Sequence, residues 1–166
     1  TIVASGPNSA NPHHVSTSRK ILKNDIILID MGCVYKGYCS DLTRVVFLGK
    51  INVQTKKIWT LVKNAHAVSL KTVKNGQKCR FVDESARLEI KKAGFADNFI
   101  HGTGHGVGLD IHEYPSVSQK SKDILKQNMV ITIEPGIYFN GKFGIRIEDT
   151  VLVTKNGYKI LTNAQY

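Results

Sequence analysis

The sequence lacks the features that would place the chain in a membrane or direct it out of the cell. No apolar run approaches the ~20 residues needed to span a bilayer. The opening stretch, TIVASGPNSANPHH, has neither the basic nor the apolar region of a signal peptide. The chain has only three cysteines, Cys33, Cys39 and Cys79, and no C-x-x-C pair, which is typical of a reducing compartment. These absences predict a cytoplasmic protein with no membrane association.

Acidic side chains are also scarce. The sequence has 13 Asp and Glu against 23 Lys and Arg, a formal net charge of +10. A charge of this size suggests nucleic-acid binding. However, the lysines are scattered, and no basic run carries interleaved aromatic residues. We therefore predict a solvated, lysine-rich surface and no nucleic-acid partner. With 166 residues and 42% hydrophobic content, the chain suits one globular domain.

The order of expected elements indicates an α+β fold. Alternating and apolar runs predict strands, helical spacing between Asn52 and Asn75 and between Arg80 and Ala93 predicts two helices, and Gly76 and Gly94 are the expected stops. The expected strands are 26–30, 42–48, 129–134, 144–153 and 158–161. The expected connecting segments are a turn at 34–37, a glycine-rich segment at 99–113 and a loop at 116–127. Such an order favours a mainly antiparallel sheet.

Two acidic residues lie symmetrically about the first hairpin. Asp30 and Asp41 are equally distant from a turn centred between Tyr35 and Lys36. In an antiparallel pair, residues at equal distance from the turn face each other, with Cβ atoms roughly 4.5–5.5 Å apart. The spacing therefore predicts two carboxylates opposite each other.

A second pair of acids surrounds the turn signal Asn140-Gly141. Glu134 and Glu148 are centred on Gly141, and each ends or interrupts an apolar strand, ITIE or GIRIE. Four carboxylates gathered in one core cannot all be neutralised by protonation at pH 7, whereas two divalent metal ions would neutralise them. The alternative is that these acids pair with Arg44 and Arg146.

A histidine is expected to complete this metal site. The stretch HGTGHGVG offers His101 and His105 between glycines, while His112 and His13 lie elsewhere in the chain. Because the glycines neither follow a clear strand nor open a helix, they do not indicate dinucleotide binding. A carboxylate-rich site with one imidazole favours Mn²⁺, with Zn²⁺, Co²⁺ or Fe²⁺ as alternatives. Asp83 is interpreted as a turn, cap or surface acid.

Four segments carry a resemblance to a known family. They are ILIDMGCVYKGYCSDLTR, HGTGHGVGLDIHEYP, ITIEPGIY and GIRIEDTVLV, and they occur in this order over nearly the whole chain. Together they resemble the pita-bread (creatinase/aminopeptidase fold) metallopeptidases, and TIEPGIY and RIEDT favour the branch of Xaa-Pro dipeptidases (prolidases) and Xaa-Pro aminopeptidases. The resemblance implies a curved, mainly antiparallel sheet with helices on one side. It also implies five metal ligands, namely Asp30, Asp41, His105, Glu134 and Glu148.

The same resemblance suggests roles for further residues. Glu134 is expected to accept and return a proton, while His13 and His112 contact the scissile carbonyl. His101, Tyr138 and Arg146 are the candidates for substrate binding. The expected substrates are small peptides with proline at the second position, and relatives are frequently homodimers. The alternative is a non-catalytic peptide-binding relative or an inactive fragment of the same fold.

One departure from the family concerns the beginning of the chain. The family's catalytic domain usually has further helices before the strand near Thr1, and many members carry an N-terminal domain before them. Residues 1–166 are therefore predicted to be a catalytic pita-bread domain truncated at the N-terminus. Two helices alone should leave one face of the sheet poorly covered.

Overall fold

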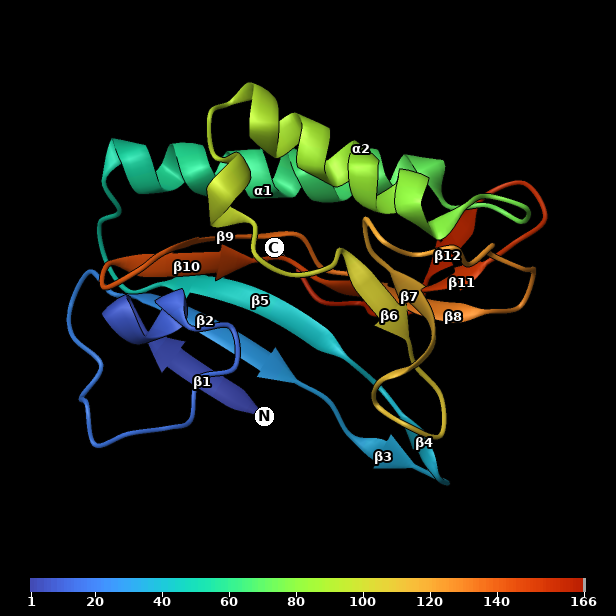
Figure 1. Ribbon diagram of the computed structural model, residues 1–166. Coiled ribbons are helices and arrows are strands. Elements are labelled where there is room, and N and C mark those ends of the chain that lie inside the picture. Colours follow the sequence, from blue (N-terminus) through green and yellow to red (C-terminus); the bar gives the residue numbers. More distant parts are fainter. Residues whose placement is uncertain (166) are drawn as a thin grey trace.

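The computed structural model describes residues 1–165 of the chain. Two α-helices, two short 3₁₀ helices and twelve strands make up the described fold (Figure 1). The helices are η1 (Gly6–Ala10), α1 (Val53–Thr72), α2 (Cys79–Lys92) and η2 (Ala96–Asn98). The strands are β1 (Ile2–Ser5), β2 (Ile26–Met31), β3 (Val34–Tyr35), β4 (Tyr38–Cys39), β5 (Leu42–Phe47), β6 (Gly104–Gly106), β7 (Glu113–Val117), β8 (Val130–Ile133), β9 (Gly136–Phe139), β10 (Phe143–Arg146), β11 (Asp149–Val153) and β12 (Tyr158–Ile160).

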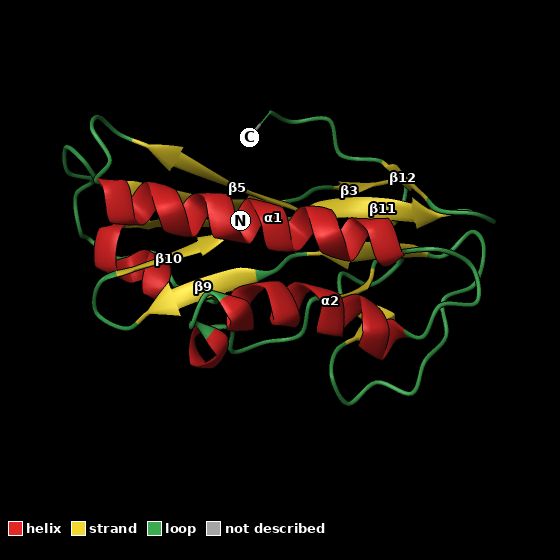
Figure 2. Cartoon of the chain, turned by 90° about the horizontal axis from the view of Figure 1, so that it is seen from above, coloured by secondary structure: helices red, strands yellow, loops and turns green. Residues whose placement is uncertain are grey.

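All strand pairs are antiparallel, which agrees with the predicted fold class. The first sheet has the order β1-β2-β5, and the largest has the order β12-β11-β8-β6-β7. The ribbons β9–β10 and β3–β4 complete the arrangement. The two long helices lie together on one side of these strands, and seen from above they run side by side (Figures 1 and 2).

The register of the first hairpin differs from the prediction. Asp30 lies opposite Thr43, and not opposite Asp41. The turn is centred one residue later than expected, because Lys36 and Gly37 form a two-residue turn with φ of 49° and 86°. Two consecutive positive φ angles are typical of the type I′ turn that closes hairpins. Since Asp41 precedes Thr43 by two residues, the two acids are diagonal neighbours on one face of the sheet.

The second ribbon has the predicted register but is broken. Ladders β9–β10 and β8–β11 share one register, which places Glu134 across from Glu148. The single strand predicted over 144–153 divides into β10 and β11, because the backbone turns toward β5 at Glu148. The Glu148 N–H donates to the Thr43 carbonyl at 3.2 Å, while the Glu134 N–H donates to Thr103 at 2.7 Å.

Strands β6 and β7 occupy parts of the segments predicted to be a glycine-rich stretch and a loop. Glycine is required in β6 by the close approach of its neighbours. A Cβ on Gly104 would lie 2.0 Å from the Thr132 carbonyl oxygen, and one on Gly106 would lie 2.2 Å from that of Tyr114. Such a strand has no apolar alternation, and for this reason its sequence did not indicate a strand.

The helices begin close to their predicted positions. The Asn52 side chain accepts a hydrogen bond from the Thr55 N–H at 2.7 Å, which caps α1. Helix α1 ends earlier than predicted, at Thr72, and Gly76 lies in the turn beyond it with φ of 82°. None of the helices in residues 1–165 is long and apolar enough to cross a membrane.

The core lies between the helices and the sheets. It combines buried positions of α1 and α2 with the inward faces of β2, β5, β9 and β10, including Ile58, Val62, Ala65, Ala86, Ile90, Ile26, Val45, Ile137 and Ile145. The outward face of β1-β2-β5 is only partly covered, as predicted. Val3, Met31 and Val46 on this face are 40–46% exposed.

The buried His66 on α1 should make the fold sensitive to acid. Its imidazole is 2% exposed, with Nε2 3.3 Å from Asp149 Oδ2. Burial lowers the pKa of His66 to about 4, although Asp149 opposes the shift. The unfolded chain therefore binds more protons between pH 6.5 and 4, and stability falls as the pH falls through this range. We expect a loss of roughly 3 kcal/mol from this group alone.

Urea unfolding at pH 7 and at pH 4.5 tests this expectation. His66→Gln should lose less stability on acidification than the wild-type chain. His14→Gln removes a half-exposed loop histidine and should lose as much stability on acidification as the wild-type chain. An equal acid loss in wild type and His66→Gln would contradict the assignment.

Candidate metal centre

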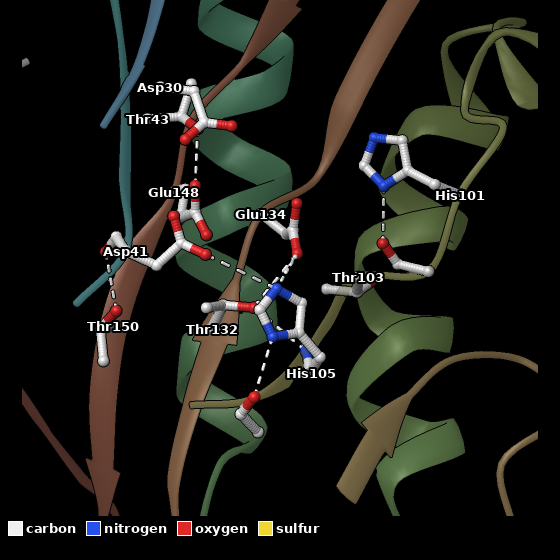
Figure 3. Close-up of polar contacts among 12 residues, drawn as sticks. Asp30, Asp41, Thr43, His101, Thr103, His105, Thr132, Glu134, Glu148 and Thr150 are labelled. Carbon is white, nitrogen blue, oxygen red and sulfur yellow. Dashed lines mark hydrogen bonds and ion pairs between the residues drawn. The ribbon is translucent and has the colours of Figure 1, made fainter. Parts of the chain in front are cut away.

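The predicted site residues meet in one cavity of about 600 Å³ between the β2–β5 strands and the β6–β8 strands. The lining includes nine of the ten, namely His13, Asp30, Asp41, His101, His105, His112, Glu134, Arg146 and Glu148. Tyr138 is the exception. Figure 3 shows the acids and His105 converging from separate strands.

Three of these residues form a compact group. Asp41, His105 and Glu148 each offer one ligand atom, and these atoms lie within 4.8 Å of one another. His105 Nε2 is also 3.2 Å from Glu134 Oε1. The Nδ1–H of the same ring donates to the Gly106 carbonyl at 3.0 Å, so Nε2 faces the carboxylates.

Asp30 reaches this group through Arg146. The Arg146 guanidinium lies 2.6 Å from Asp30 Oδ2 and donates to Thr43 Oγ1 at 3.1 Å. The Thr43 hydroxyl donates in turn to Glu148 Oε2 at 2.5 Å. The alternative of arginine pairing is therefore realised for Asp30, whereas Arg44 pairs with Asp149 at 2.7 Å.

One arginine does not compensate the whole cluster. Burial raises the pKa of Asp41 to about 6, and the charges of Asp30 and Glu134 act in the same direction. Burial, followed by Glu134 and Asp41, raises the pKa of Glu148 well above its ordinary value. Carboxylates that resist ionisation in this way need positive charge between them to carry their negative charges at pH 7.

Glu134 and His105 behave as a pair. Burial opposes ionisation of both groups, but their hydrogen bond and mutual attraction lower the pKa of Glu134 and raise that of His105. The charged forms of the two groups thus support each other.

The donor set fits divalent metal ions. Glu148 is 1% exposed, and within residues 1–165 its Oε1 atom has no hydrogen-bond partner. A buried carboxylate oxygen without a partner is costly unless a cation meets it. Carboxylate oxygens with one imidazole nitrogen suit Mn²⁺ and similar ions. Asp30, Asp41, His105, Glu134 and Glu148 are the residues that would hold them.

Two further histidines lie at the cavity mouth. His13 and His112 are both exposed, and the His112 ring meets the His105 ring edge-on with centroids 4.3 Å apart. Partial burial, followed by the neighbouring His105, lowers the pKa of His112. His112 is thereby favoured as a neutral hydrogen-bonding group. His14 does not line the cavity.

The predicted substrate-binding residues occupy different depths. His101 lines the cavity, whereas Tyr138 is 4% exposed and lies behind it. The Tyr138 hydroxyl lies 2.9 Å from His101 Nε2 and 3.0 Å from Arg146. Burial raises the pKa of Tyr138 to about 12, so this residue stays neutral and orients its neighbours.

Asp83 was misinterpreted from the sequence. It is fully buried in α2, where it pairs with Arg87 at 2.6 Å and accepts hydrogen bonds from Thr103. The signal that could have revealed it is Arg87, four residues later on the same helix.

Comparison with known proteins agrees with this geometry. The model of metallopeptidase family M24 matches residues 1–155. The chain belongs to metallopeptidase family M24. It is 46% identical over 165 residues to the Xaa-Pro dipeptidase of Pyrococcus furiosus. The matched region covers 99% of this chain and 47% of that protein.

Solved structures place this M24 chain among the pita-bread folds. The prolidase from Pyrococcus furiosus superposes with a TM-score of 0.98 and 45% identity, over 99% of this chain and 49% of that one. The X-Pro aminopeptidase from Thermotoga maritima gives 0.96 and 41%, over 99% and 46%. The chain therefore spans about half the length of the relatives that it matches.

Proposed function

We propose that this M24 chain carries a two-metal exopeptidase site that hydrolyses the bond between an N-terminal residue and a following proline. The observation that carries the proposal is the convergence of Asp41, His105 and Glu148 within 4.8 Å, beside Glu134. Its support comes also from relatives described as Xaa-Pro dipeptidases. Mn²⁺ is the favoured ion because the donors are mostly carboxylates.

The chain's own residues supply proton transfer and orientation. Bound divalent ions would provide Lewis-acid polarisation and would ease the deprotonation of water. Glu134 holds the proton taken from the attacking water and returns it to the leaving amine. His112 and His13, at the mouth, are placed to donate hydrogen bonds to the carbonyl oxygen as it gains charge.

Proline recognition requires contacts that use no amide hydrogen. The nitrogen of an X–Pro bond has no hydrogen to donate. His101 presents a ring at the cavity wall and is our candidate for packing against the proline ring. Arg146 lines the same cavity, but its guanidinium already contacts Asp30, Thr43 and Tyr138. We therefore assign Arg146 mainly to orienting these groups.

Metal binding and peptide hydrolysis measured on the same preparation test the proposal. We expect Mn²⁺ titration calorimetry to give two ions per chain, and we expect Mn²⁺-dependent release of proline from Ala-Pro. Ala-Ala is the matched substrate without the ring and should be cleaved much more slowly. Peptide binding without metal binding or turnover would favour the non-catalytic relative instead, and binding of neither would favour the inactive fragment.

A further inference from the structure

Residues 99–103, immediately before β6, have no strand partners yet carry His101 into the cavity. We propose that Asp83 and Arg87 of α2 are positioning residues that set this segment, and through it His101 and Glu134, for catalysis. The inference rests on the proposed exopeptidase function. Neither residue lines the cavity, so their effect must pass through the segment.

Arg87 supplies donors to two carbonyls of the segment. Its guanidinium donates to the Phe99 carbonyl at 2.8 Å and also to the His101 carbonyl. The same group stacks over the Phe99 ring at 4.1 Å from its centroid. A planar group with several donors can satisfy two carbonyls and a carboxylate at once, which a lysine cannot do.

Asp83 anchors both Arg87 and the end of the segment. Its two oxygens accept from the Arg87 guanidinium at 2.6 and 3.2 Å. Oδ1 also accepts from the backbone N–H and the hydroxyl of Thr103, at 3.0 and 2.9 Å. Both Asp83 and Thr103 are fully buried, so these bonds are sheltered from water.

The chain of contacts ends at the proposed catalytic group. Asp83 holds the N–H and the hydroxyl of Thr103, and the carbonyl of the same residue accepts from the Glu134 N–H at 2.7 Å. His101, in the middle of the segment, meets Tyr138 at 2.9 Å. A helix outside the cavity thereby determines where His101 and the Glu134 backbone lie.

Loss of the Asp83–Arg87 pair should affect only one side of the site. Asp30 lies in β2 and Asp41 directly precedes β5, and within residues 1–165 the hydrogen bonds of Asp83 and Arg87 do not reach these strands. Loss of the pair should therefore leave metal held by the first-sheet acids while displacing His101 and Glu134. Substitution of groups that orient active-site ligands typically costs about 10–100-fold in activity or metal affinity.

Arg87→Met tests the inference, with Arg80→Met as the matched control. Arg80 is an exposed arginine of the same helix. We expect Arg87→Met to lower kcat for Ala-Pro by about 10–100-fold. Amide hydrogen exchange should accelerate selectively at Thr103 and Glu134, whose N–H groups depend on the pair, and not in β2 or β5. Arg80→Met should match wild type in both measurements, and Asp83→Asn provides a milder second variant.

The measurements on the Asp83 and Arg87 variants test the positioning role of this pair. Wild-type kcat and wild-type exchange in both variants of the pair would overturn the inference. Faster exchange throughout both sheets would also overturn it, because it would show a role in overall stability alone. A wild-type chain that binds no Mn²⁺ and cleaves no Ala-Pro would refute the proposed function, and the catalytic positioning role with it. The exchange pattern would still tell whether the pair orders residues 99–103.

Discussion

Replacing Asp41 with Asn should abolish turnover and the response to Mn²⁺. Asp41 is one of the three residues whose ligand atoms lie within 4.8 Å, and an amide supplies no anionic oxygen. Stabilisation of charge by metal ions is worth several kcal/mol in such sites, so we expect hydrolysis to fall by about 10³-fold or more. Steady-state assays with Ala-Pro and calorimetric titration with Mn²⁺ measure the two effects.

The same substitution should have the opposite effect on the metal-free fold. Burial raises the pKa of Asp41 to about 6 from an ordinary 3.8. A carboxyl with a raised pKa in the folded state destabilises the fold as the pH rises from about 4 to 6, and this cost is complete at pH 7. Removing the charge should therefore stabilise the metal-free chain by on the order of 2–3 kcal/mol at pH 7.

A paired result of this kind separates metal binding from simple misfolding. Asp110→Asn, at an exposed acid outside the cavity, is the control and should keep both activity and the Mn²⁺ response. If Asp41→Asn unfolds more easily than wild type without metal, the crowding of negative charge is wrongly assigned. If it retains Mn²⁺ binding with wild-type affinity, the ligand assignment is wrong.

The acid cluster could be predicted because the acids of each pair lie at equal distances in the sequence from an expected turn. Glu134 and Glu148 surround Asn140-Gly141, and the structure keeps that register through two ladders. The first hairpin shows the weakness of the same reasoning. The turn at Lys36-Gly37 moves the partner of Asp30 by two residues, from Asp41 to Thr43, and Asp30 and Asp41 stay on one face because the side-chain period is two.

What the sequence could not indicate depends on contacts between distant segments. Strand β6 is a strand only because its glycines let β7 and β8 approach, and no local periodicity encodes that approach. Tyr138 was predicted to contact substrate, but it lies behind the cavity wall, since a strand pattern gives a face and not a depth. Asp83 is buried because α2 packs against a segment that follows it in sequence.

Replacing Arg146 with Met should strongly destabilise the chain without metal. The Arg146 side chain is 3% exposed and lies 2.6 Å from Asp30 Oδ2 and 3.9 Å from Glu134 Oε2. Removing one partner of a buried ion pair leaves an uncompensated charge and typically costs about 3–5 kcal/mol. Urea unfolding of the metal-free chain at pH 7 should show this loss. The pair of Arg19 and Asp25 offers the control, because Arg19 is 25% exposed and the Leu22 N–H still donates to Asp25 without it, so Arg19→Met should cost less than Arg146→Met.

The double variant Arg146→Met/Asp30→Asn distinguishes charge from packing. If the loss arises from the stranded carboxylate of Asp30, removing that charge should restore a large part of the stability, giving strong coupling in the double-mutant cycle. If the loss arises from the space left by the guanidinium, the two effects should add instead. Added Mn²⁺ should also recover stability in Arg146→Met. A cation between the acids compensates their negative charge, as the Arg146 guanidinium does in the metal-free chain.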